Sequence, residues 1–125
     1  MSNEDNIALA HRVVDAVNWD NIEALSELFA PDAVRHDLAD LFSHGSVAET
    51  QAFLRELKTA FPDLHVTIER EFVSDDHVTA VLKSIGTHEG ITIYRIEDGR
   101  IAESWQLADW LGVLEQVGAA KVKRP

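Results

Sequence analysis

The sequence of 125 residues contains no cysteine, which excludes disulfide bonds, catalytic thiolates and cysteine metal sites. It also lacks an apolar run of roughly 20 residues, the length that a membrane-spanning helix needs. Its acidic N-terminal stretch, MSNEDNIALAHRVVDAV, has no secretory signal pattern. We therefore expect a soluble, cytoplasmic protein that does not interact with membranes.

Positive charge is scarce, because 11 Lys and Arg residues stand against 22 Asp and Glu residues and give a net charge of −11. Such a chain repels phosphate backbones, so nucleic acid is not expected as a partner. The histidines and acidic residues show no metal-ligand spacing, and we expect no metal site. A glycine-rich phosphate loop and a G-x-S-x-G nucleophile elbow are missing as well.

The chain does have enough apolar residues, 46%, for one hydrophobic core. No repeat, low-complexity segment or linker divides it. Residues 1–125 are therefore predicted to form a single domain.

Three helices are predicted in the first half of the chain. Two of them begin at capping boxes, in which a serine stands three positions before an acidic residue: Ser2 with Asp5, and Ser46 with Glu49. We expect these helices over about residues 4–18 and from residue 46 to Pro62. Between them, Asp20 is the expected N-cap of a further helix, which Pro31 ends.

Strands are predicted in the second half, after a short strand over residues 33–37. The alternation of apolar and polar residues from Leu64 to Phe72 is typical of a strand with one solvent-facing side. Three more strands are expected over residues 78–87, 91–96 and 100–108. The turns between them are predicted at residues 74–76, at Glu89 and Gly90, and at residues 97–99.

Helices followed by antiparallel strands indicate an α+β fold. A curved antiparallel sheet would wrap around the N-terminal helices and form a cone with one open mouth. An apolar mouth of this kind, with a few polar groups, is the usual form of a small-molecule site. The sequence therefore favours a hydrophobic small molecule as the partner.

The most informative stretch is YRIEDGRIAESWQLADWLGVLEQVG, residues 94–118, in which Asp109 ends an apolar strand. In a regular strand Asp109 shares one face with Trp105 and Leu107. Those side chains would then desolvate the carboxylate and make it a stronger base. Asp109 also directly precedes an apolar helical pattern, so a role as helix N-cap is an equal alternative.

Other polar residues could line the same mouth. His36 and Asp37 end the short strand, where the imidazole could orient a catalytic carboxylate, although a surface His–Asp pair fits equally. His88 lies beside a predicted turn, either at the mouth or exposed. Arg95 could point inward and stabilise an enolate oxygen, or lie on the sheet surface beside a glutamate. Tyr94 and Gln106 are further candidates for substrate binding.

Three segments, FPDLHVTIE, GTHEG and residues 94–118, resemble the SnoaL-like polyketide cyclases, within the superfamily of ketosteroid isomerase and nuclear transport factor. The most specific element is I-x-E-x-W, followed by an aspartate four residues after the tryptophan and by L-G-x-L-x-Q-x-G. The resemblance covers nearly the whole chain. It implies a cone-shaped, cystatin-like α+β barrel that is commonly a homodimer and uses no metal or organic cofactor.

The resemblance also implies a function, namely aldol ring closure of an apolar carbonyl substrate, or its isomerisation or dehydration. Asp109 matches the family's acid/base aspartate, while His36 and His88 match common histidines, and Asp37 falls near the base position of ketosteroid isomerase. The alternative is a non-catalytic ligand-binding or dimerisation module, since one fold hosts many functions. The chain departs from the family in a shorter segment after Gly90, which should alter the cavity, and in Ser104, where histidine is common.

Overall fold

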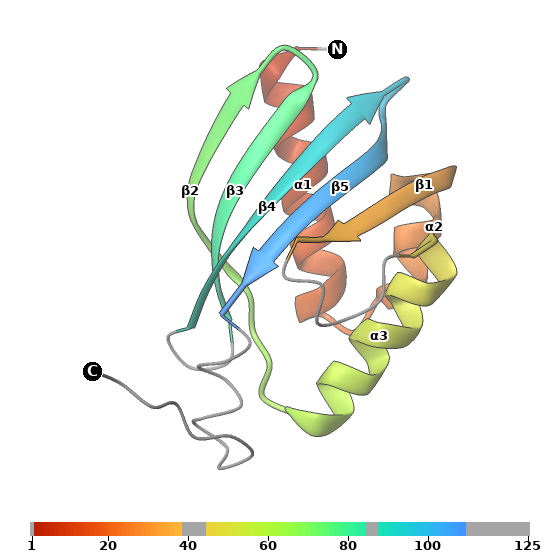
Figure 1. The fold of residues 1–125 in the computed structure, drawn as a ribbon, viewed down its shortest axis with the longest axis vertical. Coiled ribbons are helices and arrows are strands. Elements are labelled where there is room, and N and C mark those ends of the chain that lie inside the picture. Colours follow the sequence, from red (N-terminus) through yellow and green to blue (C-terminus); the bar gives the residue numbers. More distant parts are fainter. Residues whose placement is uncertain (1, 39–44, 85–87, 110–125) are drawn as a thin grey trace.

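The computed structural model describes residues 2–38, 45–84 and 88–109. The helical elements are α1 (Asn3–Asn18), η1 (Ile22–Ala24), α2 (Leu25–Leu28) and α3 (Val47–Ala60). The strands are β1 (Phe29–Asp37), β2 (Thr67–Ser74), β3 (His77–Ser84), β4 (His88–Glu97) and β5 (Arg100–Ala108). This set confirms the predicted α+β class, as Figure 1 shows.

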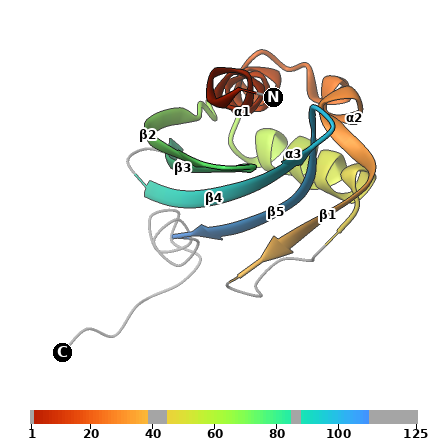
Figure 2. The same cartoon turned by 90° about the horizontal axis from the view of Figure 1, so that it is seen from above.

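The strands form one sheet in the order β1-β5-β4-β3-β2. The helices lie on its concave face, and no helix of the described part of the chain covers the convex face (Figure 2). Strands β2 to β5 are antiparallel, but β1 runs parallel to β5. The prediction of a wholly antiparallel sheet was therefore wrong. A long connection separates β1 from β5, so no hairpin fixes their relative direction.

Both predicted capping boxes are present. The Ser2 hydroxyl accepts a hydrogen bond from the Asp5 N–H at 3.1 Å, and the Ser46 hydroxyl accepts one from the Glu49 N–H at 3.3 Å. Such caps satisfy backbone donors that have no partner within the helix. The first and third predicted helices are therefore confirmed.

The second helix differs from the prediction. Asp20 has φ 56° and does not cap it, and the chain becomes extended from Phe29, so that Pro31 lies inside β1. A proline is tolerated there because β1 is an edge strand. Strand β2 also starts late, since the Leu64 N–H donates to the Phe61 carbonyl at 2.9 Å in a turn.

Two predicted turns are confirmed and one is wrong. The turn predicted at residues 74–76 joins β2 to β3. Residues 97–99 form the hairpin turn, with φ 52° at Asp98 and 76° at Gly99, as a tight two-residue turn requires. Glu89 and Gly90, however, belong to β4. A Cβ at Gly90 would stand 3.2 Å from the Leu107 carbonyl oxygen, so this glycine permits a close strand approach. Residues 85–87, which connect β3 to β4 in the chain, lie outside the described part.

The main core lies between α1 and the concave face. Leu25, Val78 and Ile101 are each no more than 1% exposed, and Leu9 of α1 packs into the same cluster. Among the described residues, no helix is both long and apolar enough to cross a membrane. The end of the core beyond this cluster is not filled by side chains, and the candidate site lies there.

Candidate functional site

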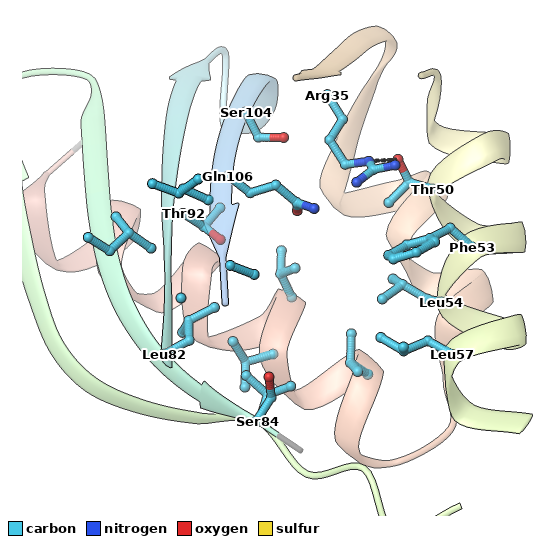
Figure 3. Close-up of a pocket in the computed structure, with 18 of the residues that line it drawn as sticks. Arg35, Thr50, Phe53, Leu54, Leu57, Leu82, Ser84, Thr92, Ser104 and Gln106 are labelled. Carbon is cyan, nitrogen blue, oxygen red and sulfur yellow. Dashed lines mark hydrogen bonds between the residues drawn. The ribbon is translucent and has the colours of Figure 1, made fainter. Parts of the chain in front are cut away.

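A cavity of about 150 Å³ lies between the concave face of the sheet and helices α1 and α3 (Figure 3). Its wall is mainly apolar, and the helices contribute Val13, Val14, Val17, Phe53, Leu54 and Leu57. The amphipathic patterns of α1 and α3 explain this wall, because each helix turns its apolar stripe toward the sheet. Polar side chains enter the cavity mainly from the strands.

Strand β5 contains a bulge that decides which of its side chains reach the cavity. Ile96 pairs with Ile101, but its neighbour Arg95 pairs with Glu103, so β5 has one extra residue at this point. The extra residue reverses the alternation. As a result Ile101 and Ser104 both point inward, and Trp105 points outward. The expectation that Trp105 shares an inward face with Asp109 was therefore wrong.

Three of the sequence candidates meet on the outer, convex face of the sheet. The Trp105 ring stacks on that of His36, with centroids 5.6 Å apart. His36 Nε2 lies 2.7 Å from Glu103 Oε2, and Arg95 Nε donates to Glu103 Oε1 at 3.3 Å. The hydrogen bond from His36, with help from Arg95, lowers the pKa of Glu103. Arg95 thus has the surface pairing with glutamate that was one of its two predicted positions.

Two other candidates are buried on the inner side. Asp37 is 1% exposed but is not among the residues that line the cavity. Tyr94 is 6% exposed and does line it. Burial raises the pKa of Tyr94 to about 12, because the phenolate would lose its hydration. At neutral pH Tyr94 is therefore a neutral phenol, able to donate a hydrogen bond to a ligand.

Asp109 and His88 meet at the rim of the cavity, where both line its wall. His88 Nδ1 lies 3.2 Å from Asp109 Oδ2, and their side chains are 22% and 53% exposed. The Asp109 N–H donates to the Glu89 carbonyl at 3.2 Å, which fixes the backbone of this rim. A carboxylate beside an imidazole can exchange a proton with a bound ligand. The predicted helix after Asp109 lies outside the described residues.

Apart from Gln106, the sequence reasoning missed the polar group at the inner end of the cavity. This group comprises Arg35, Thr50, Thr92, Ser104 and Gln106. Arg35 is 4% exposed, its Nε donates to Thr50 Oγ1 at 3.1 Å, and its Cζ lies 5.0 Å from the centre of the Phe53 ring. Desolvation lowers the pKa of Arg35, against the opposing effect of Asp37 and Glu49. The only signal was the alternation of β1, which places Ala33, Arg35 and Asp37 on one face.

Within the described ranges, no group of three or more His, Asp or Glu side chains is arranged to hold a metal ion. The titratable residues that line the cavity in the described part of the chain are His88, Glu89 and Asp109 near its rim, together with Tyr94 and Arg35. Together they offer a carboxylate, an imidazole and several hydrogen-bond donors around an apolar space. Such a set suits proton transfer and carbonyl recognition.

Comparison with known proteins agrees with this geometry. The family model of SnoaL-like polyketide cyclases matches residues 7–117. A candidate polyketide cyclase from Acidithiobacillus ferrooxidans is 27% identical, with a TM-score of 0.74 over 96% of this chain and 100% of that one. A loop-truncation variant of IdmH, a candidate polyketide cyclase from Streptomyces antibioticus, is 26% identical, with a TM-score of 0.80 over 94% and 100%.

A third structure shares the fold at lower identity. AclR, a candidate hydroxylase from Streptomyces galilaeus, is 19% identical, with a TM-score of 0.81 over 96% of this chain and 100% of that one. Its likeness extends to the fold alone. A comparison with curated protein sequences gives no match.

Proposed function

Because the chain belongs to the SnoaL-like polyketide cyclase family, we propose that it is an enzyme acting on an apolar, carbonyl-bearing small molecule. The chemistry is cofactor-independent acid–base catalysis, and polyketide aldol cyclisation is its specific form; isomerisation or dehydration would use the same groups. The observation that supports this proposal most directly is the His88–Asp109 pair, 3.2 Å apart, on the rim of an apolar cavity.

The proposed reaction begins with Asp109. Its carboxylate removes a proton from the carbon next to a substrate carbonyl, and the electron pair passes to the carbonyl oxygen as an enolate. The enolate carbon then attacks a second carbonyl carbon, which forms the new C–C bond and leaves an alkoxide. The alkoxide takes back the proton from Asp109, so the carboxylate is regenerated.

His88 assists Asp109 in this scheme. A hydrogen bond from Nδ1 to the carboxylate restricts its orientation and stabilises its charged form between the two proton transfers. The imidazole has two ring nitrogens, so His88 can also pass the proton on to solvent between turnovers. A substrate seated in the cavity would cover Asp109 and remove water from it, which makes the carboxylate a stronger base.

One observation favours the alternative, a non-catalytic binding module. The Asp109 side chain is 53% exposed, and an exposed carboxylate is a weak base. In that case the cavity would bind an apolar ligand without changing it. The two functions differ in whether a bound carbonyl compound is consumed.

The decisive experiment replaces Asp109 with Asn and follows both turnover and binding on aryl polyketones, using the absorbance of the aromatic product. The amide keeps the shape of the side chain but cannot act as a base, so turnover should fall about 10²- to 10⁴-fold while binding changes little. Glu56→Gln, which removes an exposed carboxylate of α3 away from the cavity, is the matched control.

His88→Gln should lower turnover less than Asp109→Asn, because the carboxylate that removes the proton is still present. A fully active Asp109→Asn enzyme would rule out the proposed mechanism. Tight binding of a polyketone that wild-type protein never consumes would favour the binding module.

We further propose that the protein forms a homodimer through the convex face of the sheet. Phe72, Ile91 and Leu107 are 45–59% exposed, and the last two are direct partners across β4 and β5 at the end of the sheet where they also border the cavity. The charges beside them are paired among themselves, as with Arg95 and Glu103. A face that is apolar and locally neutral suits contact with an identical face.

A further inference from the structure

The inner end of the cavity holds a buried cation for which the proposed reaction has no use. The alternation of β1 turns Arg35 inward, and its pairing with β5 places Arg35 beside Ser104. Both residues are at most 4% exposed and both line the cavity. Burial of a guanidinium is costly even when other charges lie nearby, so its place on a ligand-sized space calls for an explanation.

The guanidinium is held in a fixed orientation. Its Nε donates to Thr50 Oγ1 at 3.1 Å, and that hydroxyl in turn donates to the Ser46 carbonyl at 3.0 Å. The Phe53 ring lies 5.0 Å from Arg35 Cζ, within the range of a cation–π contact. With Nε held by Thr50 and the ring of Phe53 beside it, the group is organised before any ligand arrives.

Further polar side chains gather around it. Ser104 pairs with Tyr94, and Gln106 pairs with Thr92, so these inward side chains are neighbours on β4 and β5. Figure 3 shows Ser104, Gln106 and Thr92 on the strands facing Arg35, which lies on the α3 side of the cavity beside Thr50. This end therefore offers several hydrogen-bond donors in an otherwise apolar part of the cavity.

The polar inner end is distinct from the rim. Arg35 is level with Ser104, and Asp109 follows five residues later, which corresponds to about 16 Å along a strand. A cavity of about 150 Å³ has room for roughly one aromatic ring. A ring bound against Arg35 would therefore leave the remainder of a longer ligand near His88 and Asp109.

We propose that Arg35, oriented by Thr50, binds the carbonyl oxygen of a neutral ring that enters the cavity first. This inference rests on the proposed function, because it names the substrate class of the same cavity: ring ketones whose reacting chain stays at the rim. Arg35 then determines specificity, and proton transfer takes place at the rim of the cavity.

The charges around Arg35 favour a neutral ligand over an acid. Asp37, 1% exposed, and Glu49 both act on the guanidinium and already offset its charge. A carboxylate ligand would add another negative charge to this group and would lose its hydration on entry. A carbonyl oxygen accepts the same hydrogen bonds at a smaller desolvation cost.

The test uses three probes of similar size that cannot react: acetophenone, ethylbenzene and benzoate. Affinities are measured by amide chemical-shift titration of the full chain. Acetophenone should bind about tenfold more tightly than ethylbenzene, the gain expected from a hydrogen bond to a charged donor. Benzoate should bind more weakly than acetophenone.

Three variants locate the effect. In Arg35→Met the preference for acetophenone should disappear while ethylbenzene affinity stays within about twofold. Thr50→Val keeps the charge of Arg35 but removes the hydroxyl that holds its Nε, and should reduce the preference for acetophenone partly. This variant tests the proposal if Arg35→Met fails to fold. Leu57→Met, at the apolar wall, is the matched control and should change both affinities by the same factor.

An unchanged acetophenone preference in Thr50→Val, and in Arg35→Met if folded, would show that Arg35 is only structural and would overturn the proposal. Tighter binding of benzoate than of acetophenone would overturn the proposal that the ligand is a neutral ring ketone. Asp109→Asn should keep the preference for acetophenone over ethylbenzene. Loss of turnover in Asp109→Asn therefore tests the proposed function, whereas loss of that preference in Arg35→Met tests the role of Arg35.

Discussion

The buried phenol of Tyr94 makes the stability of this protein depend on pH in the alkaline range. It is the only tyrosine in the chain, it is 6% exposed, and burial raises its pKa from 10.0 to about 12. Below pH 10 the phenol is neutral in both the folded and the unfolded chain. Above pH 10 the unfolded chain ionises first, so the folded state loses stability until the pH passes about 12.

The size of the effect follows from the shift. A shift of about 2 units corresponds to about 3 kcal/mol, since each unit is worth 1.36 kcal/mol. About half of this loss should be complete near pH 11, midway between the two pKa values. That is a large part of the stability of a small domain.

The measurement compares urea unfolding of the wild type and of Tyr94→Phe from neutral pH to about pH 12. Other groups titrate equally in both proteins, so the difference between the two curves isolates Tyr94. The phenolate absorbance band gives a second readout, because no other tyrosine contributes to it. We expect that band to develop near pH 12 in the folded protein and near pH 10 only in unfolded protein.

Two results would refute this reasoning. The first is a phenolate band that develops near the ordinary pKa of tyrosine while the protein remains folded. The second is an identical pH dependence of unfolding in the wild type and Tyr94→Phe. Either would mean that the phenol reaches water through the cavity, and the cavity would then be more open than the burial of Tyr94 indicates.

Two further predictions concern the core and the convex face. Ile101→Ala, at a fully buried position, should lower the free energy of unfolding by about 2–5 kcal/mol, measured by urea unfolding; a loss well below 1 kcal/mol would contradict the assigned core position. Phe72→Glu should convert the proposed dimer into a monomer in light-scattering mass measurements, whereas Trp19→Glu, at a 75% exposed position of α1's C-terminal end, should not. A monomeric wild type would remove the basis of the dimer proposal.

The features that the sequence predicted well are set by residues close together in the chain. The serine capping boxes act over three positions, and the turn at Asp98 and Gly99 needs only the residues that adopt positive φ. The bounds of β5 also agree with the prediction. Each of these features can be recognised without knowing what packs against it.

The features that it missed depend on contacts between distant segments. The parallel pairing of β1 with β5 joins residues about 70 positions apart in sequence, such as Arg35 and Ser104. The inward position of Arg35 opposes the general tendency of charged side chains to face water, so the alternation of β1 could not by itself reveal it. Gly90 was taken for a turn residue because its role, the close approach of β5, is visible only in the sheet.

The bulge in β5 had the largest consequence for the site. No glycine marks it, since the sequence there is Ile101, Ala102, Glu103, and a regular strand was the natural expectation. Compared with a regular strand, the extra residue reverses which side chains face inward. Trp105 therefore points outward and Ser104 lines the cavity. The position of Asp109 was still found, because it lies at the rim where the strand ends.

The same bulge gives Ser104 a meaning that its place before Trp105 did not suggest. Since Ser104 faces inward between Arg35 and Tyr94, the common histidine at this position would occupy space at the inner end of the cavity. The small hydroxyl leaves that space open and Arg35 accessible to a ligand. In terms of the two proposals, this departure from the family pattern would affect which ring the cavity accepts, whereas the proposed proton transfer takes place at His88 and Asp109 at the rim.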